Sequence, residues 1–566
     1  MEVSKLINSL IKQKKLMVFC GAGISINSGI PTVYPLLTKL LSELGCENEH
    51  IKLLFNSSFP FEAIMENIKE RVDISKLIKL FDLNNPNSNH NLIAWLAKNE
   101  YLNTILTTNF DQNIEIALSN SGLNENEDYF VISDLDKFNI ENYSDKIIVV
   151  KLHGNIKEPE SVLTTISKIA NRRNTNLMHG VLENIFLSNR FENILFIGYS
   201  FSDHFDIKPA IVSMPTCNKN VFFIQHQNTE TTQRVVDSAD NPLFDKFLSA
   251  QCLQCNFEAV VSLVYDEFQI NKFSYKKSDE WIAIIESWTK SEFDKDSFVN
   301  KKNCLGYLFI AAGFINISKY YAELNLDKID SSREGKILQM FVSDIIGKSY
   351  LKDPNERDAG EAAKHYITAR QLAENLELNH FAKTFSGDLG SCYLMQQDFL
   401  KAEELFNEAI EYYKPLLDNS EQREKIIEKY IRISIHLAHS YAKRGMFPQS
   451  INLYKEILPL SEEGGFTSSF ELCMTGYGLA SVLNNDLKTG LQLFTSAYPI
   501  AKAYGSIDRI RSLFFLICSW TKEVEGLTNA KEFYDKEIKY IKETTDFDRP
   551  LEEIPERLIK DYKYKK

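Results

Sequence analysis

Several polar residues that could do chemistry stand directly after short apolar runs in this sequence. Asn109 and Asp111 follow one run, His153 follows another, and Ser200 and Asp203 follow a third. An imidazole is a general base near neutral pH, and a neutral amide orients a water molecule or a sugar hydroxyl. The same residue types also form turns and cap helices, so each has a purely structural interpretation as well.

A glycine-rich stretch near the N-terminus indicates a different kind of chemistry. The first apolar run is followed at once by Gly21, Ala22 and Gly23, and then by Ser25. Glycines let the backbone approach a diphosphate, and N–H groups at a helix start favour negative charge, so this stretch predicts a dinucleotide site. The next glycine, Gly29, falls too late for the G-x-G-x-x-G pattern, and a tight turn without a ligand is the alternative.

The elements that must position these residues are buried strands. Five short apolar runs alternate with segments of helical periodicity, and they cover residues 16–19, 101–108, 146–152, 193–198 and 220–225. This alternation predicts a Rossmann-like α/β domain with a parallel sheet. Ligands of such sheets bind at the carboxyl ends of the strands, where Ser25, Asn109, His153, Ser200 and Gln225 all fall. We therefore expect these side chains to converge on one cleft.

The same segments resemble the sirtuin family in their order and in their placement at strand ends. The resemblance is carried by Gly21–Ser25 with Gly29–Pro31, by Thr108–Asp111, by Leu152–Gly154 and by Gly198–Ser200. It covers roughly residues 1–270, and it implies that NAD is bound as a substrate.

The resemblance also implies a role for each matched residue. Asn109 and His153 would be catalytic, with His153 as the general base and Asn109 orienting a water molecule or the ribose. The residues that would contact NAD are Gly21, Ala22, Gly23, Ser25, Thr108, Asp111, Gly198, Ser200 and Asp203. Cleavage of the nicotinamide–ribose bond needs a held sugar and a delivered water, so we expect no metal ion.

Two departures separate the chain from the protein deacylases of that family. Deacylases follow Gly-Ile-Pro with Asp-Phe-Arg, whereas this chain has Thr32, Val33 and Tyr34. They also carry a zinc ribbon after the histidine, and residues 155–193 contain no cysteine. The segment Gly198–Asp203 instead resembles bacterial defence-associated sirtuin-like proteins, which cleave NAD to nicotinamide and ADP-ribose.

Three functions follow from these observations. The leading interpretation is an NAD hydrolase (an NAD glycohydrolase) that acts in antiphage defence by abortive infection. A protein deacylase whose helical region recruits substrates is the second. The third is a non-catalytic scaffold that binds NAD or ADP-ribose.

The chain beyond about residue 275 has helical periodicity throughout and an internal repeat. Small residues recur at spacings of 40, 48, 40 and 40, and each is followed four positions later by an aromatic residue. The pairs are Ala362 and Tyr366, Ala402 and Phe406, Ser450 and Tyr454, Gly490 and Phe494, and Ala530 and Tyr534. Twelve positions before the middle three pairs stand Gly390, Ala438 and Gly478.

This order of small and aromatic residues resembles the tetratricopeptide repeat, and it predicts an all-α superhelix. A helical bundle without repeats is the alternative. We expect a catalytic domain at residues 1–275 and a repeat domain at residues 276–566. The repeat domain would sense a trigger protein or drive assembly of a homo-oligomer.

Composition limits the classes of partner and compartment. The net charge is −13 over 566 residues, which disfavours direct nucleic-acid binding. Nine cysteines are dispersed along the chain, and there is no long apolar run, so we expect a cytoplasmic protein without a membrane segment. The one C-x-x-C, Cys252–Cys255, is interpreted as a strand or connector rather than half of a zinc site.

Overall fold

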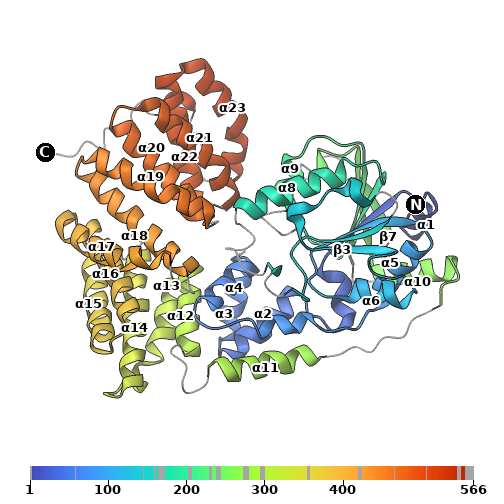
Figure 1. Ribbon diagram of the computed structural model, residues 1–566, viewed down its shortest axis with the longest axis horizontal. Coiled ribbons are helices and arrows are strands. Elements are labelled where there is room, and N and C mark those ends of the chain that lie inside the picture. The colour runs from blue at the N-terminus through green and yellow to red at the C-terminus, as the bar shows by residue number, and fades with distance from the viewer. Residues whose placement is uncertain are drawn as a thin grey trace. The chain divides into compact units, whose positions relative to one another are not determined.

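The computed structural model of the chain forms two compact units, one within residues 3–293 and one within residues 300–554. Figure 1 shows the helices and strands of each. The structure describes residues 3–57, 59–143, 146–158, 161–163, 172–201, 207–227, 233–237, 244–271, 279–293, 300–353, 357–418, 423–464, 466–504, 507–544 and 550–554.

The first unit is built on one eight-stranded sheet. Its strands are β1 (Leu16–Cys20), β2 (Leu102–Thr107), β3 (Tyr129–Ile132), β4 (Ile147–Lys151), β5 (Asn193–Ile197), β6 (Asn220–His226), β7 (Gln233–Asp237) and β8 (Ser249–Cys255). Their order is β3-β4-β2-β1-β5-β6-β8-β7, and every neighbouring pair is parallel except β7 with β8. The predicted α/β fold with a mostly parallel sheet is confirmed.

Helices cover both faces of this sheet (Figure 1). The helices of the unit are α1 (Val3–Lys12), α2 (Val33–Glu43), α3 (Asn48–Asn56), α4 (Phe61–Lys69), α5 (Ser88–Lys98), α6 (Asn113–Asn120), α8 (Arg172–Phe186), α9 (Ile207–Ser213), α10 (Phe257–Glu267) and α11 (Glu280–Glu292). One apolar core joins the sheet to α1, α5, α6 and α10, and a second joins it to α8 and α9.

Burial explains which strands the sequence predicted. All five residues of β1 and of β5 are buried, as expected of central strands covered on both faces. The five predicted runs are all strands, and no end differs from its prediction by more than one residue. Strand β8 contains Cys252 and Cys255, so the interpretation of this C-x-x-C as a strand is confirmed.

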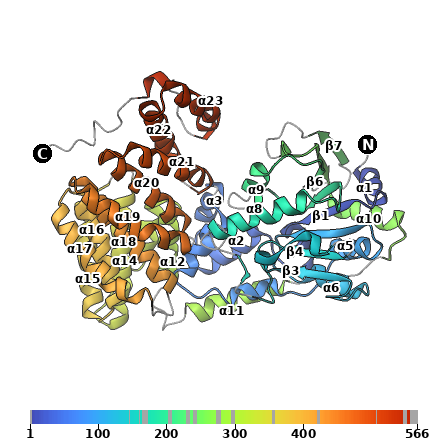
Figure 2. The ribbon, with the colours of Figure 1, turned by 45° about the horizontal axis from the view of Figure 1, so that its top comes forward.

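The second unit is all helical, and its helices stack one after another (Figure 2). They are α12 (Lys301–Ala311), α13 (Ile315–Glu323), α14 (Arg333–Lys352), α15 (Ala359–Asn375), α16 (Asn379–Met395), α17 (Phe399–Tyr413), α18 (Arg423–Lys443), α19 (Phe447–Glu463), α20 (Thr467–Leu483), α21 (Leu487–Tyr504), α22 (Ile507–Val524) and α23 (Leu527–Thr544).

The small and aromatic residues of the repeat meet between paired helices. A methyl group placed on Gly390 of α16 would lie 2.7 Å from Cε1 of Phe406 on α17, so only glycine lets this ring pack there. Gly478 of α20 has the same relationship to Phe494 of α21, at 2.6 Å. This recurring contact confirms a tetratricopeptide-like repeat array.

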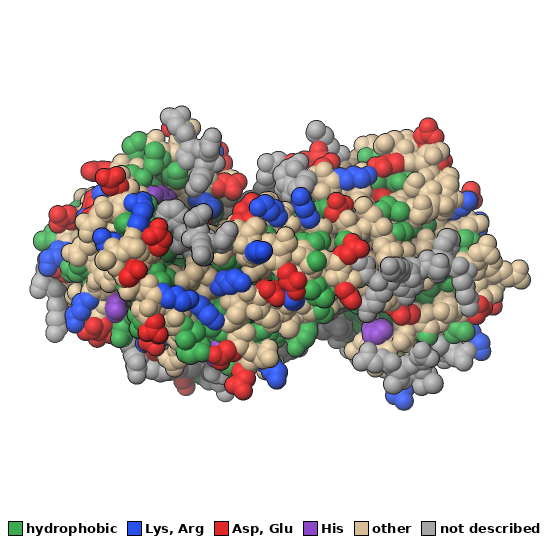
Figure 3. All heavy atoms as spheres, turned by 90° about the horizontal axis from the view of Figure 1, so that it is seen from below, with side chains coloured by type: hydrophobic (Ala, Val, Ile, Leu, Met, Phe, Trp, Pro, Cys, Tyr) green, Lys and Arg blue, Asp and Glu red, His purple; other side chains and the backbone are tan. Residues whose placement is uncertain are grey.

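The surface of the chain mixes both signs of charge. Acidic and basic side chains are interspersed over the face that Figure 3 shows. Among the helices that the structure describes, none is long and apolar enough to span a bilayer.

Candidate functional site

Three of the sequence-predicted side chains meet around one hydroxyl at the carboxyl ends of β1 and β2. The Nδ2 amide of Asn109 donates to Oγ of Ser25 at 3.2 Å, and that hydroxyl donates to Oδ2 of Asp111 at 3.0 Å. All three residues are buried. Because β1 and β2 are neighbours in the sheet, residues 84 positions apart in the sequence form one hydrogen-bonded group.

A histidine from a different segment completes this group. Nε2 of His90, at the start of α5, lies 3.2 Å from Oγ of Ser25, and its Nδ1 accepts from the backbone N–H of Asn87 at 3.1 Å. Complete burial lowers the pKa of His90 to about 3, so the ring is neutral near pH 7. With Nδ1 accepting, Nε2 carries the proton and donates to the hydroxyl of Ser25.

The glycine-rich stretch is fastened to the end of β5. The backbone N–H groups of Gly21 and Gly23 donate to the carbonyls of Ile197 and Gly198, both at 2.9 Å. A Cβ atom on Gly21 would lie 2.5 Å from the carbonyl oxygen of Gly198, closer than real Cβ atoms come. The glycines therefore allow two backbone segments to touch. The stretch continues as a 3₁₀ helix, η1 (Ala22–Ser28), rather than an α-helix.

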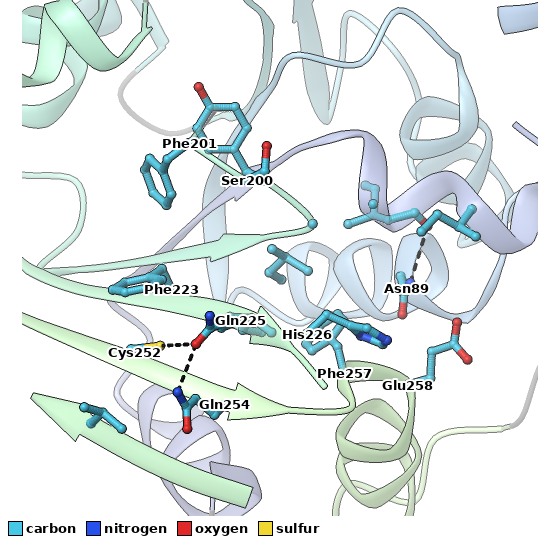
Figure 4. A pocket seen from close by; sticks show the side chains of 18 residues that line it. Asn89, Ser200, Phe201, Phe223, Gln225, His226, Cys252, Gln254, Phe257 and Glu258 are labelled. Carbon is cyan, nitrogen blue, oxygen red and sulfur yellow. Dashed lines mark hydrogen bonds between the residues drawn. The ribbon is translucent and has the colours of Figure 1, made fainter. Parts of the chain in front are cut away.

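A cavity of about 680 Å³ opens beside this contact, at the carboxyl ends of β1, β5, β6 and β8. Gly23 and Gly198 form part of its wall, and Ser200 and Phe201 follow from the loop after β5 (Figure 4). Its volume is that of a pocket for a small organic ligand.

The polar side chains of this cavity are oriented by their neighbours. Oε1 of Gln225 accepts from Nε2 of Gln254 at 3.0 Å and from the thiol of Cys252 at 3.5 Å (Figure 4). Because Oε1 of Gln225 accepts both of these hydrogen bonds, the NH₂ group of the same side chain points away from Gln254 and Cys252. Nδ2 of Asn27 on η1 donates to Glu258, a residue of the cavity wall at the start of α10.

Residues 103–228 match the family model described as a SIR2-like domain. The first unit carries a SIR2-like domain. The matched residues run from β2 to β6 and include the strand ends that hold Asn109, Asp111 and Gly198. None of the curated proteins matches the chain.

Several solved structures are similar to the chain at low identity. The apo form of RapI is 14% identical, with a TM-score of 0.34, over 47% of this chain and 91% of that chain. A Rap protein complexed with competence and sporulation factor is 15% identical, with a TM-score of 0.36, over 47% and 72%. A signal transduction ATPase with a tetratricopeptide repeat sensor, from Pyrococcus horikoshii, is 14% identical, with a TM-score of 0.25, over 97% and 90%.

Within the first unit the predicted residues fall into two neighbouring places. Gly23, Gly198 and Ser200 belong to the cavity wall, whereas Asn109 and Asp111 lie around Ser25 and are not among the described residues of that wall. The separation arises because β1 lies between β2 and β5.

The other predicted residues have these positions. Ala22 begins η1, and the N–H of Thr108 donates to the carbonyl of Cys20 at 3.1 Å. The ring of His153, after β4, lies 6.5 Å from that of Phe110, so it is at the strand end next to Asn109. Asp203 lies outside the described residues.

Sequence reasoning missed His90, Asn89 and Glu258. Asn89 belongs to the cavity wall, and its Nδ2 donates to the carbonyl of Ile24 at 3.3 Å. The available signal was the polar segment at residues 84–89, where Asn87 and His90 form a capping box at the start of α5. That pattern predicts where a helix starts, but only the fold shows that the start of α5 lies against η1.

Proposed function

We propose that this protein is an NAD hydrolase that releases nicotinamide and ADP-ribose. The observation that supports this most strongly is the hydrogen-bonded group of Ser25, Asn109 and Asp111 at the carboxyl edge of the sheet, in which Asn109 and Asp111 belong to the residues that match the SIR2-like domain. These are the residues at which the sequence resembles the sirtuins. A SIR2-like domain suggests an NAD-related activity, and hydrolysis is the reaction that these residues support best.

The two places in the first unit would suit the two halves of NAD. We place the adenosine half in the 680 Å³ cavity, against the aromatic side chains of Phe201 and Phe223 and the amide of Gln225. The nicotinamide riboside half would reach over η1 toward Asn109 and His153 at the ends of β2 and β4. Among the described residues of the cavity wall Glu258 is charged and there is no Lys or Arg, so the base and sugar would meet mainly neutral groups.

The reaction needs little covalent chemistry from the protein. The nicotinamide–ribose bond breaks as positive charge moves from the pyridinium ring to the ribose, and nicotinamide leaves as a neutral molecule. The Asn109 amide would orient the attacking water or the ribose. His153 would take the proton of that water as the new C–O bond forms, a role worth typically 10²–10⁴-fold in rate.

The test is to incubate the full-length protein with NAD and to measure nicotinamide and ADP-ribose, with and without an acetyl-lysine peptide. We expect turnover with water alone, and we expect Asn109→Ala and His153→Ala each to lower it by at least about 100-fold. Asn120→Ala, an exposed amide at the end of α6, is the matched control and should keep the wild-type rate. Turnover that requires the peptide would indicate a deacylase, and binding without turnover would indicate a scaffold.

We further propose that the helical repeat unit regulates this activity, because loss of NAD stops metabolism and an NAD hydrolase must be held inactive until needed. In this view the protein acts in antiphage defence. Cells that express it should lose NAD when infected by a phage that triggers it, and cells with Asn109→Ala should not. Retention of NAD in wild-type cells across a panel of restricted phages would overturn the defence role.

A further inference from the structure

Helix α11 (Glu280–Glu292) stands at the point in the sequence where the first unit ends. Eight residues separate it from α12, the first helix of the second unit. Its buried side chains, Ile285, Trp288 and Thr289, recur at the spacing of one helix face. The helix packs on α2 and on a short 3₁₀ helix, η2 (Leu77–Phe81) (Figure 1). By its contacts α11 therefore belongs to the first unit, although the chain leads from it into the repeats.

Trp288 is the main anchor of α11. Its indole Nε1 donates to the backbone carbonyl of Asp73 at 2.8 Å, and only 2% of the residue is exposed. One turn further on, Oε1 of Glu292 lies 3.1 Å from Nζ of Lys76, the residue before η2. The side chain of Lys76 is 58% exposed, and an exposed ion pair stabilises a fold far less than a buried indole ring. Loss of the Trp288 ring should therefore loosen α11 from the segment that leads into η2.

The far end of η2 reaches the loop after β2. The ring centroid of Phe81, the last residue of η2, lies 5.0 Å from that of Phe110, and the two rings meet edge to face at 68°. Phe110 stands between Asn109 and Asp111 in the chain. Its ring centroid also lies 6.5 Å from that of His153. A displacement of η2 is therefore passed to the ring that lies between Asn109 and His153.

Two backbone N–H groups tie the same segments together. The N–H of Asn85, just after η2, donates to Oδ1 of Asn113 at 2.8 Å. The N–H of Ile156, after β4, donates to the carbonyl of Phe110 at 3.0 Å. Among the described residues of the 680 Å³ cavity wall, none comes from α11 or from residues 73–85. The contacts of α11 thus lead to the ends of β2 and β4 and not to that cavity.

We propose that α11 is a positioning element for the reaction. Trp288 holds the segment that leads into η2, and Phe81 of η2 holds the ring of Phe110. Asn109 and His153 thereby keep their places at the ends of β2 and β4. A misplacement of reacting groups by about 1 Å lowers a rate by about 10²-fold, so a loosened α11 slows the reaction. This inference rests on the proposed function for the roles of Asn109 and His153.

The place of α11 in the chain gives this positioning role a regulatory use. The eight residues between α11 and α12 are a covalent link from the repeat unit to the helix that carries Trp288. A change in the repeat unit that displaces α11 would act on the ends of β2 and β4, where the nicotinamide half of NAD is placed. It would leave the adenosine half in its cavity, so catalysis would change while NAD stays bound.

The first measurement is hydrogen exchange of the full-length protein without NAD, followed by mass spectrometry. In Trp288→Ala we expect peptides over residues 109–113 and 153–156 to exchange at least about tenfold faster, because these loops open locally more often. A peptide over residues 21–24, whose N–H groups bond to the end of β5, should change less than about twofold. Trp288→Phe keeps an aromatic ring but lacks the hydrogen bond to Asp73, so its effect should be smaller and in the same direction.

The matched control for Trp288→Phe is Trp520→Phe on α22. Both indole rings are buried, but Nε1 of Trp520 has no hydrogen-bond partner in the described part of the chain. Trp520→Phe should therefore keep the wild-type exchange rates in all three peptides.

The second measurement separates kcat from KM for nicotinamide release, with the amount of folded protein taken from the stoichiometry of ADP-ribose binding. Trp288→Ala should lower kcat at least about tenfold and change KM for NAD less than about threefold. The proposal is overturned if Trp288→Ala leaves exchange over residues 109–113 unchanged, if residues 21–24 accelerate equally, or if KM rises while kcat stays. Faster exchange over residues 109–113 in a protein that releases no nicotinamide would support the hold of α11 on this loop and would count against the hydrolase alone.

Discussion

The hydroxyl of Ser25 donates to a carboxylate oxygen of Asp111 at 3.0 Å and so joins the loop after β1 to the loop after β2. Oγ of Ser25 in turn accepts from Nδ2 of Asn109, at 3.2 Å, and from Nε2 of His90. A hydroxyl group has one donor and two acceptor positions, so Ser25 uses all three. The two loops therefore hold each other in place through a single buried oxygen atom.

Replacing Ser25 by alanine should disrupt this group and destabilise the first unit. Ser25→Ala removes a partner from each of Asn109, Asp111 and His90, and a buried polar group left unsatisfied costs about 1–3 kcal/mol. Urea unfolding, monitored by hydrogen exchange of the backbone amides of β1 and β2, measures the change in the free energy of unfolding. The matched control is Ser28→Ala, because its hydroxyl is equally buried but has no partner in the described part of the chain. Equal effects of the two changes would contradict the prediction, as would unchanged NAD turnover in Ser25→Ala.

His90 should make the stability of the first unit depend on pH. Its pKa is lowered by burial to about 3 in the folded state, against about 6.5 when unfolded. Between these values the unfolded state binds more protons, so the contribution of the neutral ring is complete above pH 6.5 and is lost as pH falls toward 3. The slope is at most about 1.4 kcal/mol per pH unit.

The measurement compares the free energy of unfolding of the wild type with that of His90→Gln between pH 7 and pH 4. The difference in the free energy of unfolding between the wild type and His90→Gln should shrink as the pH falls, because His90 titrates and glutamine does not. Parallel curves across this range would show that His90 is not held neutral by the fold.

Much of this fold was predictable from the sequence, and the exceptions have physical reasons. Central strands such as β1 and β5 are buried on both faces and therefore read as unbroken apolar runs. Strand β8 alternates polar and apolar residues, and β7 lies at the sheet edge, so neither gives such a run. The contact between Gly21 and Gly198 depends on strand order, because β5 lies beside β1 although some 170 residues separate them.

The candidate site was predictable only in part, for a similar reason. Ser25, Asn109 and Asp111 each follow an apolar run, so their place at one sheet edge could be inferred. His90 follows no strand, and its contact with Ser25 arises from the packing of α5 against η1. Local sequence patterns do not record such a tertiary contact.

A side chain at Gly21 should be far more damaging than one at Gly180. A Cβ atom on Gly21 would lie 2.5 Å from the carbonyl oxygen of Gly198, which is backbone and cannot turn aside, whereas a Cβ on Gly180 of α8 meets nothing within 4 Å. Gly21→Ala should therefore lower the melting temperature and abolish NAD binding. Gly180→Ala should stabilise the protein by about 0.5–1 kcal/mol, since alanine favours a helix interior. Equal melting temperatures for the two variants would contradict the close approach.

A buried ion pair lies next to the backbone of Asp111. Nζ of Lys151, the last residue of β4, lies 2.7 Å from Oε1 of Glu115 on α6 and also donates to the backbone carbonyl of Asp111. Lys151 is fully buried and Glu115 is 4% exposed. Lys151→Met leaves the carboxylate of Glu115 buried without its cation, and breaking a buried pair in this way costs about 3–5 kcal/mol.

The double variant Lys151→Met/Glu115→Leu separates the cost of an orphaned charge from the value of the pair. Because replacing both partners by apolar groups removes the buried charge altogether, we expect the double variant to be more stable than Lys151→Met alone. Lys151→Met and the double variant both lack the hydrogen bond from Lys151 to the Asp111 carbonyl. We therefore expect low NAD turnover in both, even where the double variant regains stability. A double variant as unstable as Lys151→Met would show that the loss comes from packing at position 151 and not from the charge of Glu115.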